Sequence, residues 1–282
     1  MSTATATRPA AKVSGGASIE GRSITKRFPG KTGVFTAIED VTFSVKGGEF
    51  VSLIGPSGCG KSTLMLIAAG LQPPSEGEIL IGGQRLTDPL HDVGIVFQDH
   101  LLLDFRTALD NILLQHQIRG MPLEQGRADT LALMQKIGIA HAADRYPHQL
   151  SGGMRQRVSI ARALIHGPSV LLMDEPFGAL HAITRTQIRH DLEVLWLETR
   201  KTVLFITHSV EEAVGLSDRI LVMGPSPGAV VDEIRVDLPR PRPIVLGDVQ
   251  AFTAYVDRIH RQFERLGVLH GVEAPDAGAV RP

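Results

Sequence analysis

The nine residues from Gly55 to Thr63 have the types and the spacing needed to hold phosphate groups. They fit the pattern G-x-x-x-x-G-K-S/T and read Gly55, Pro56, Ser57, Gly58, Cys59, Gly60, Lys61, Ser62 and Thr63. An apolar strand ending at Ile54 is expected before them and a helix after them. In that setting backbone N–H groups and the positive end of the helix face phosphate oxygens. The flanking strand and helix disfavour the alternative, a chance glycine-rich turn.

The same loop assigns roles to two of its side chains. We expect Lys61 to reach the β- and γ-phosphates of a nucleotide, and the Ser62 hydroxyl to ligate Mg²⁺. The loop predicts nucleotide binding but does not by itself indicate the reaction.

Two carboxylates follow a second apolar run, Val170 to Met173. Asp174 is expected to hold Mg²⁺, directly or through water, and Glu175 to act as the general base that polarises the attacking water. The alternative is a strand that simply enters a solvated loop. The complete phosphate-binding loop upstream favours the catalytic interpretation.

A second anion-binding helix terminus is predicted within the run LSGGMRQR. Ser151, Gly152 and Gly153 open a helix and offer a hydroxyl and bare backbone N–H groups. One nucleotide has no evident need for two such termini. Two chains arranged head to tail do need them, because each terminus closes on the nucleotide of the other chain. Taken alone, Ser-Gly-Gly is equally well read as an ordinary helix cap.

In this order, the motifs closely resemble those of ABC transporter ATPases over about residues 19–236. The resemblance implies ATP and Mg²⁺ as cofactors and a homodimer, or a dimer with a close paralogue, that sandwiches two ATP molecules. It makes Gln98 the glutamine that senses Mg²⁺ and water, and His208 the histidine that contacts the γ-phosphate. A lone histidine after a strand is usually structural, but its order among four other motifs favours the functional role. Phe28 resembles the aromatic residue that stacks on adenine; Phe35 is a rival, and either could belong to the core.

One position departs from the family pattern. After Pro176 to Leu180 the family normally has an aspartate at the dimer interface, and this chain has His181. The substitution is either neutral or weakens hydrolysis without abolishing it, because a histidine lacks the fixed negative charge.

These residues require an α/β fold to position them. Short apolar strands are expected at Phe43–Val45, 50–54, 79–81, 93–97, 170–173, 203–206 and 219–223, with helices at 61–69, 154–164, 183–199 and 210–216. Their alternation predicts a P-loop NTPase of the ABC ATPase type, with a mostly parallel core sheet and an N-terminal antiparallel β region. The helical pattern from Leu101 to Tyr146 indicates a helical subdomain inserted at about residues 99–155.

Three segments divide the chain in this interpretation. Residues 1–18 are predicted to be a disordered leader and residues 19–236 the ATPase domain. Residues 237–282 are predicted to contain a proline-rich extended linker, a helix from Phe252 to Leu266 and a loose tail from Gly271.

The composition narrows the class of protein. The chain has 282 residues, 43% of them hydrophobic and 21% charged, with a formal net charge of −1, which argues against broad electrostatic binding of nucleic acid. A single cysteine, Cys59, excludes an internal disulfide and suits a reducing cytoplasm. The longest apolar runs, such as 64–71, are far shorter than the roughly 20 residues that span a bilayer. Work at a membrane therefore requires a partner.

The end of the core resembles one branch of the family. The runs THSVEEA at 207–213, VMGPSPG at 222–228 and DLPRPR at 237–242 look like those of bacterial ATPases for nitrate, alkanesulfonate and taurine import. The resemblance implies a peripheral protein on the cytoplasmic face of the inner membrane, two transmembrane permease subunits and, indirectly, an extracytoplasmic solute-binding protein.

The segment 100–111 is expected to form much of a groove for a permease helix. Its apolar lining is expected from Phe97, Leu101, Leu102, Leu103 and Phe105, with ordinary subdomain core as the alternative for at least half of them. Leu103-Asp104-Phe105 differs from the Pro-Trp often found in relatives.

Three other functions are alternatives to that of an importer subunit. A soluble ABC ATPase acting on nucleic acid or the ribosome is disfavoured by the single cassette, the short insert and the absence of a basic excess. A subunit that binds nucleotide with impaired hydrolysis is suggested by His181 but opposed by intact Lys61, Asp174, Glu175 and His208. A P-loop kinase does not explain LSGGMRQR.

Overall fold

The computed structural model describes residues 15–30, 33–90, 92–242 and 249–268. Its centre is a six-stranded sheet in which all neighbouring strands are parallel except β10, which runs antiparallel to β9. This confirms the mostly parallel core sheet. In spatial order the strands are β10 (Val230–Arg235), β9 (Arg219–Met223), β3 (Phe50–Ile54), β8 (Thr202–Ile206), β7 (Val170–Asp174) and β6 (Val93–Val96).

A second, antiparallel sheet forms the N-terminal region, as predicted. Its order is β2 (Gly33–Val45), β1 (Ile19–Gly30), β4 (Glu76–Ile81) and β5 (Gln84–Arg85). The sequence revealed only the ends of β2 and β4, because three register shifts in the β1–β2 pairing interrupt the alternation of apolar residues. The Lys46–Glu49 turn joins β2 to β3, yet these strands lie in different sheets.

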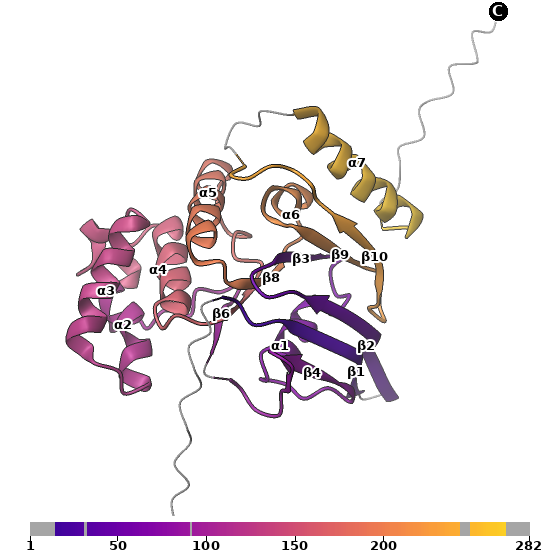
Figure 1. The fold of residues 1–282 in the computed structure, drawn as a ribbon, viewed down its shortest axis with the longest axis horizontal. Helices are drawn as coiled ribbons and strands as arrows, with labels where there is room; N and C mark the ends of the chain where they lie inside the picture. The colour runs from indigo at the N-terminus through magenta and orange to yellow at the C-terminus, as the bar shows by residue number, and fades with distance from the viewer. Residues whose placement is uncertain (1–14, 31–32, 91, 243–248, 269–282) are drawn as a thin grey trace, which may run out of the picture.

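Helices cover the parallel sheet on both faces (Figure 1). On one face, α1 (Lys61–Ala68) and the antiparallel sheet bury alternate strand residues, among them Leu53 and Leu172. On the other, α4 (Gly152–Leu164) and α5 (Ala182–Thr199) bury the intervening residues, such as Leu171 and Phe205. Burial on both faces explains why these strands are continuously apolar.

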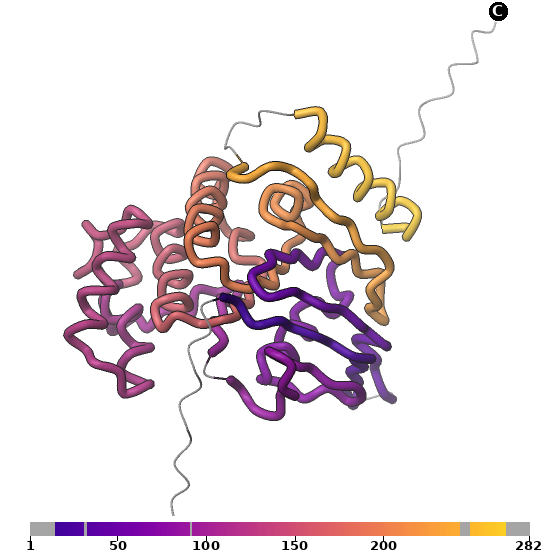
Figure 2. The backbone as a smooth tube through the Cα atoms, in the orientation of Figure 1, coloured from indigo at the N-terminus to yellow at the C-terminus, as the bar shows by residue number. Residues whose placement is uncertain are grey.

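The predicted helical insert forms a lobe of its own. It contains α2 (Ala108–Ile118), α3 (Leu123–Lys136) and 3-10 turns at Ala140–Ala142 and Pro147–Gln149. Figure 2 follows the chain out of β6 into this magenta lobe and back along α4. Asn111 is buried and fixes the loop before α2: its amide donates to the carbonyls of Leu103, Arg106 and Thr107 and accepts from the N–H of Leu103.

The C-terminal part lies over α6 (Val210–Leu216) and β10. The predicted last helix is present as α7 (Val249–Arg265), which buries Phe252, Ile259 and Phe263 against them. Residues 237–242 contain no helix or strand, in keeping with the expected linker. The leader up to residue 14 and the predicted tail from Gly271 lie outside the described residues; residues 15–18 are described, and Gly82 donates to the Ser18 carbonyl. Among the helices in the described ranges, none combines the length and apolar character needed to cross a membrane.

Candidate functional site

Four neighbouring parallel strands bring the candidate residues to one edge of the sheet. The phosphate-binding loop follows β3, His208 follows β8, Asp174 and Glu175 end β7, and Gln98 follows β6. Ile206 is paired with both Leu53 and Asp174, so β3, β8 and β7 end level with one another. The carboxyl edge of a parallel sheet is where α/β proteins bind their ligands. Residues up to 153 positions apart in the chain therefore meet here because of strand order (55 to 208).

The glycine-rich loop encloses the Lys61 ammonium. Lys61 is 6% exposed, and its Nζ donates to the carbonyls of Gly55 at 3.0 Å and Pro56 at 2.9 Å. Gly60 has φ 96°, and a Cβ there would lie 2.9 Å from the Ala37 carbonyl. Only glycine permits both that backbone conformation and that approach of β2. No side chain caps the start of α1, so its first N–H groups remain available to an anion.

Asp174 has the features of a cation ligand. It is 8% exposed and its Oδ1 has no hydrogen-bond partner among the described residues. Burial raises the pKa of this carboxyl, while hydrogen bonding from Ser62 and the charge of Lys61 oppose the rise. A buried carboxylate oxygen without a partner is costly unless a cation or donor satisfies it. With the Ser62 hydroxyl beside it, the oxygen donor set fits a hard divalent cation such as Mg²⁺.

Glu175 and His208 contact each other across the gap between two loops. His208 Nδ1 lies 3.2 Å from Glu175 Oε2, and the two side chains are 54% and 22% exposed. Glu175 has φ 42°, an uncommon conformation for a residue with a side chain. Its N–H donates to the Ile206 carbonyl of β8 at 2.9 Å. The carboxylate is therefore held at the sheet edge with access to solvent, as a general base must be.

Gln98 is exposed immediately beyond β6, and its neighbour Phe97 lines a groove beside that strand. The groove encloses about 350 Å³, and Phe97, Leu101 and Leu103 line it. The contact of these residues with a permease stays a prediction. Leu102 instead packs into the core of the helical lobe, and Phe105 is 76% exposed outside the groove. Leu102 thus matches the alternative prediction of subdomain core, and a permease contact of the exposed Phe105 stays a prediction.

The remaining predicted residues lie at the start of α4 and on the antiparallel sheet. Ser151 caps α4 by accepting from the Met154 N–H at 3.3 Å, and Gly152 and Gly153 form the helix's first turn. Phe28 pairs in register with Phe35 on the antiparallel sheet. Phe28 is half-buried with the Lys26 ammonium 5.2 Å from its ring centroid, whereas Phe35 is 53% exposed. The choice between the two for adenine stacking stays a prediction.

His181 occupies the N-cap position of α5. Its side chain makes no capping hydrogen bond, and the first turn of α5 contains no acidic residue. An aspartate here would cap the helix and complement its dipole. The departure from the family pattern thus leaves the start of α5 without its usual anion.

Sequence reasoning missed residues that support the loops. Gly228, in the β9–β10 turn, donates to the Ala37 carbonyl, and a Cβ there would lie 1.8 Å from the Cys59 carbonyl. Arg162 of α4 donates to the carbonyls of His100 and Leu101 at 2.8 and 2.6 Å. Both are contacts with main-chain atoms distant in sequence, so no local pattern signals them.

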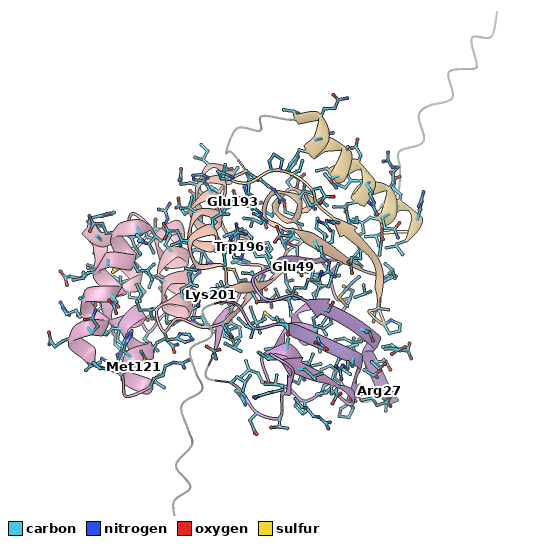
Figure 3. The ribbon with its side chains drawn as sticks, in the orientation of Figure 1. Arg27, Glu49, Met121, Glu193, Trp196 and Lys201 are labelled. Carbon is cyan, nitrogen blue, oxygen red and sulfur yellow. The ribbon has the colours of Figure 1, made fainter. Side chains whose placement is uncertain are left out.

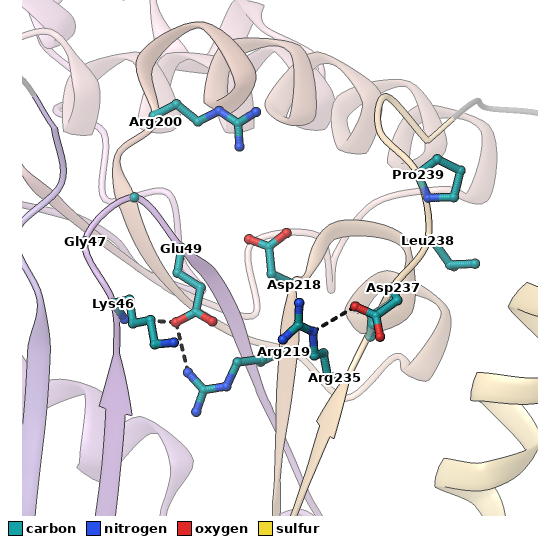
Figure 4. A pocket seen from close by; sticks show the side chains of 12 residues that line it. Lys46, Gly47, Glu49, Arg200, Asp218, Arg219, Arg235, Asp237, Leu238 and Pro239 are labelled. Atoms are coloured by element: carbon teal, nitrogen blue, oxygen red, sulfur yellow. Dashed lines mark hydrogen bonds and ion pairs between the residues drawn. The ribbon is translucent and has the colours of Figure 1, made fainter.

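A cavity of about 660 Å³ lies at the opposite, amino edge of the sheet (Figure 4). Its charges are largely paired with one another: Arg219 with Glu49 at 2.9 Å, and Arg235 with Asp237 at 2.8 Å. None of the residues predicted to bind nucleotide lines it. The candidate site is therefore the carboxyl edge.

The site combines a strand–loop–helix unit that binds phosphate, a buried strand with two acids at its end, and a histidine that follows the strand between them. These features define an ATPase of the P-loop α/β class. The ABC transporter family model matches residues 38–178. An uncharacterised ABC transporter ATP-binding protein of Methanocaldococcus jannaschii is 42% identical over 78% of this chain and 82% of its own length. The chain belongs to the ABC transporter family, as its motifs indicated.

Other similar proteins support the same family membership. The aliphatic sulfonates import ATP-binding protein SsuB of Bacillus cereus is 39% identical over 87% of this chain and 96% of its own. The nitrate import ATP-binding protein NrtD of Synechococcus elongatus is 42% identical over 84% and 90%. Among solved structures, the dimeric post-hydrolysis state of the ATP-binding cassette MJ0796 with ADP and Pi has a TM-score of 0.71 and 33% identity. It covers 78% of this chain and the whole of that one.

Proposed function

We propose that this chain is the ATP-hydrolysing subunit of a bacterial ABC importer for a small anion such as nitrate, an alkanesulfonate or taurine. The convergence of Lys61, Asp174, Glu175 and His208 on one sheet edge carries the assignment as an ATPase. The import direction and the anion class rest on the similarity to SsuB and NrtD. Selectivity for the solute belongs to other subunits.

In the proposed reaction, Lys61 and the backbone N–H groups of its loop hold the phosphates of ATP. Ser62, Asp174 and Gln98 would hold Mg²⁺, which supplies positive charge to the phosphates. Glu175 accepts a proton from the attacking water, and His208, 3.2 Å away, orients the carboxylate and contacts the γ-phosphate. The 54% exposure of His208 leaves its ring open to a ligand.

The proposed assembly is a head-to-tail homodimer, or a dimer with a close paralogue, in which Ser151 to Gly153 of one copy close on the ATP of the other. The dimeric MJ0796 structures support a dimer. The exposure of Ser151 at the start of α4 supports the same contact.

We propose that two permease subunits receive this dimer at the cytoplasmic face of the inner membrane. The groove beside β6 supports this partner, since Phe97, Leu101 and Leu103 line it next to Gln98. A permease helix seated in this groove would move when the residues around the nucleotide site move. An extracytoplasmic solute-binding protein would take part only through the permease.

The test compares the purified chain with Glu175→Gln, measuring ATP hydrolysis and oligomer size with and without Mg-ATP. The matched control is Glu124→Gln, an exposed acid on α3. We expect Glu175→Gln to lower the rate by about 10²–10⁴-fold and to accumulate as an ATP-bound dimer. A variant that stays monomeric at saturating Mg-ATP contradicts the head-to-tail assembly. A wild-type chain that binds ATP without turnover, even with its permease, favours the subunit with impaired hydrolysis.

A further inference from the structure

The loops that follow β7 and β8 are joined by a small buried network behind the Glu175–His208 contact. Its centre is Glu212, on the first turn of α6. Glu212 Oε2 accepts a hydrogen bond from the Thr207 hydroxyl, and the same hydroxyl oxygen accepts from the Ser209 N–H at 3.0 Å. Thr207 and Ser209 flank His208, so Glu212 fixes the backbone on both sides of the histidine.

The other carboxylate oxygen of Glu212 reaches towards the loop that carries Glu175. Oε1 lies 3.6 Å from Nε of Arg185, on the first turns of α5. Nη2 of the same guanidinium donates to the Leu180 carbonyl at 3.2 Å. Leu180 lies in the short loop between Glu175 and α5, which is tightened by hydrogen bonds from Gly178 to Glu175 and from Leu180 to Phe177. Arg185 therefore connects Glu212 to the second of the two loops.

Burial makes this network hard to replace by water. Thr207 is 1% and Glu212 5% exposed. Burial raises the pKa of the Glu212 carboxyl; the Thr207 hydrogen bond and the charges of Arg185, His208 and Arg189 oppose that rise. Arg185 and Arg189 face Glu212 from α5, and His208 from the β8–α6 loop. The cations of α5 thus hold a carboxylate at a position where an unpaired one would be costly.

We propose that Glu212 is a positioning residue for hydrolysis: together with Thr207 and Arg185 it locks the loop of His208 to the loop of Glu175 and so sets the distance between these two side chains. The inference rests on the proposed roles of Glu175 and His208. Glu212 itself directs its carboxylate to Thr207 and Arg185, not to the phosphate-binding loop. Its removal should therefore alter the chemical step and leave ATP binding intact.

The test measures kcat and KM for ATP in Glu212→Gln, beside the matched control Glu211→Gln. Glu211 is the neighbouring acid on the same turn, exposed, and its Oε2 accepts only a surface hydrogen bond from Ser209 Oγ at 2.9 Å. We expect Glu212→Gln to lower kcat by about tenfold, the scale seen when a group that orients a reacting residue is lost, with KM changed less than about twofold. Glu211→Gln should retain wild-type kcat.

A double-mutant cycle that combines Glu212→Gln with Arg185→Gln distinguishes one shared positioning role from two independent losses of activity. If the two residues act as one connection, the double variant loses little more activity than the worse single variant. Additive losses, an unchanged kcat in Glu212→Gln, or a rise in KM at constant kcat each overturn the proposal. Should Glu212→Gln fail to fold, Thr207→Val carries the test, since it removes only the bridging hydroxyl; wild-type kcat in that variant also overturns the proposal.

The His208→Ala variant distinguishes failure of this inference from failure of the proposed function on which it rests. A His208→Ala variant with full activity contradicts the proposed site itself. An inactive His208→Ala beside a fully active Glu212→Gln leaves the site in place and removes only the positioning role.

Discussion

The two edges of the parallel sheet both carry charged residues but use them in opposite ways. At the amino edge, Arg219 is paired with Glu49 and Glu233, and Arg240 with Glu193 and Asp218. At the carboxyl edge, Lys61 is bonded to carbonyls and an oxygen of Asp174 has no partner among the described residues. Charged groups that are paired with one another stabilise the fold, whereas charged groups with unused hydrogen-bonding capacity are available to a ligand.

The paired charges of the amino edge can be followed in Figure 4, and Figure 3 labels Glu193 and Trp196. Glu193 and Trp196 lie on α5, and the Arg240 guanidinium stacks 4.4 Å from the Trp196 ring while donating to Glu193 at 2.9 Å. The cavity beside this cluster is bordered by the Glu49–Arg219 and Arg235–Asp237 pairs. The comparison teaches that cavity size alone does not locate a binding site in this molecule.

The largest effect is expected from removing the cation of the carboxyl edge. Lys61→Ala should lower ATPase activity by at least about 10²-fold, because it removes the positioned donor to the phosphates. Folding should change little, since Lys61 bonds to two backbone carbonyls and not to a carboxylate. The measurements are ATP turnover and thermal unfolding. Lys46→Ala, a cation of the amino edge, is the control, and equal losses in both variants would contradict the contrast between the edges.

A smaller effect is expected from a substitution at the amino edge, which should lower the free energy of unfolding but not the ATPase activity. Arg240→Ala removes the buried partner of Glu193 and should lower the free energy of unfolding by about 3–5 kcal/mol. Activity per folded molecule should persist at temperatures below the transition. Denaturant unfolding measures the loss, and Arg235→Ala, whose pair with Asp237 is exposed, should cost much less. A loss of activity in fully folded Arg240→Ala would show that the edges are coupled.

The smallest effect is expected at His181, which begins α5 and therefore touches the carboxyl edge. His181→Asp supplies an N-cap side chain that α5 lacks and should stabilise the protein by about 1 kcal/mol. If the histidine weakens hydrolysis, the same variant should raise the ATPase rate of the assembled complex by about twofold or more, because an added charge at this position acts at the dimer interface. Calorimetry and turnover measure the two effects, with His141→Asp as the surface control. An unchanged rate means that the substitution is neutral for hydrolysis.

The sequence predicted the carboxyl edge far better than the amino edge. The phosphate-binding loop and the pair Asp174 and Glu175 are contiguous motifs, so their residue types alone predicted them. Gln98 and His208 followed from their order among those motifs. The helices α4, α5 and α6 were placed to within two residues at each end because their apolar faces and their caps are local features.

Prediction failed where contacts cross between elements. β1 was not located because its register shifts break the period of two. Leu102 and Phe105 were expected either at the groove or in the subdomain core, and only the fold shows that Leu102 packs in the helical lobe and that Phe105 faces solvent. Gly228 stands in the run 222–228 without any local sign of this contact, and only the fold brings the Cys59 carbonyl within 1.8 Å of where its Cβ would stand.

The sequence by itself determined the chemistry of this protein, because a strand, a tight loop and a helix start are encoded by adjacent residues. Only the tertiary structure decided that Glu175 and His208, 33 residues apart, lie 3.2 Å from each other, and that Glu212 and Arg185 join their loops. The physical reason is that strand order and helix crossings depend on the burial of the whole core. No short segment contains that information.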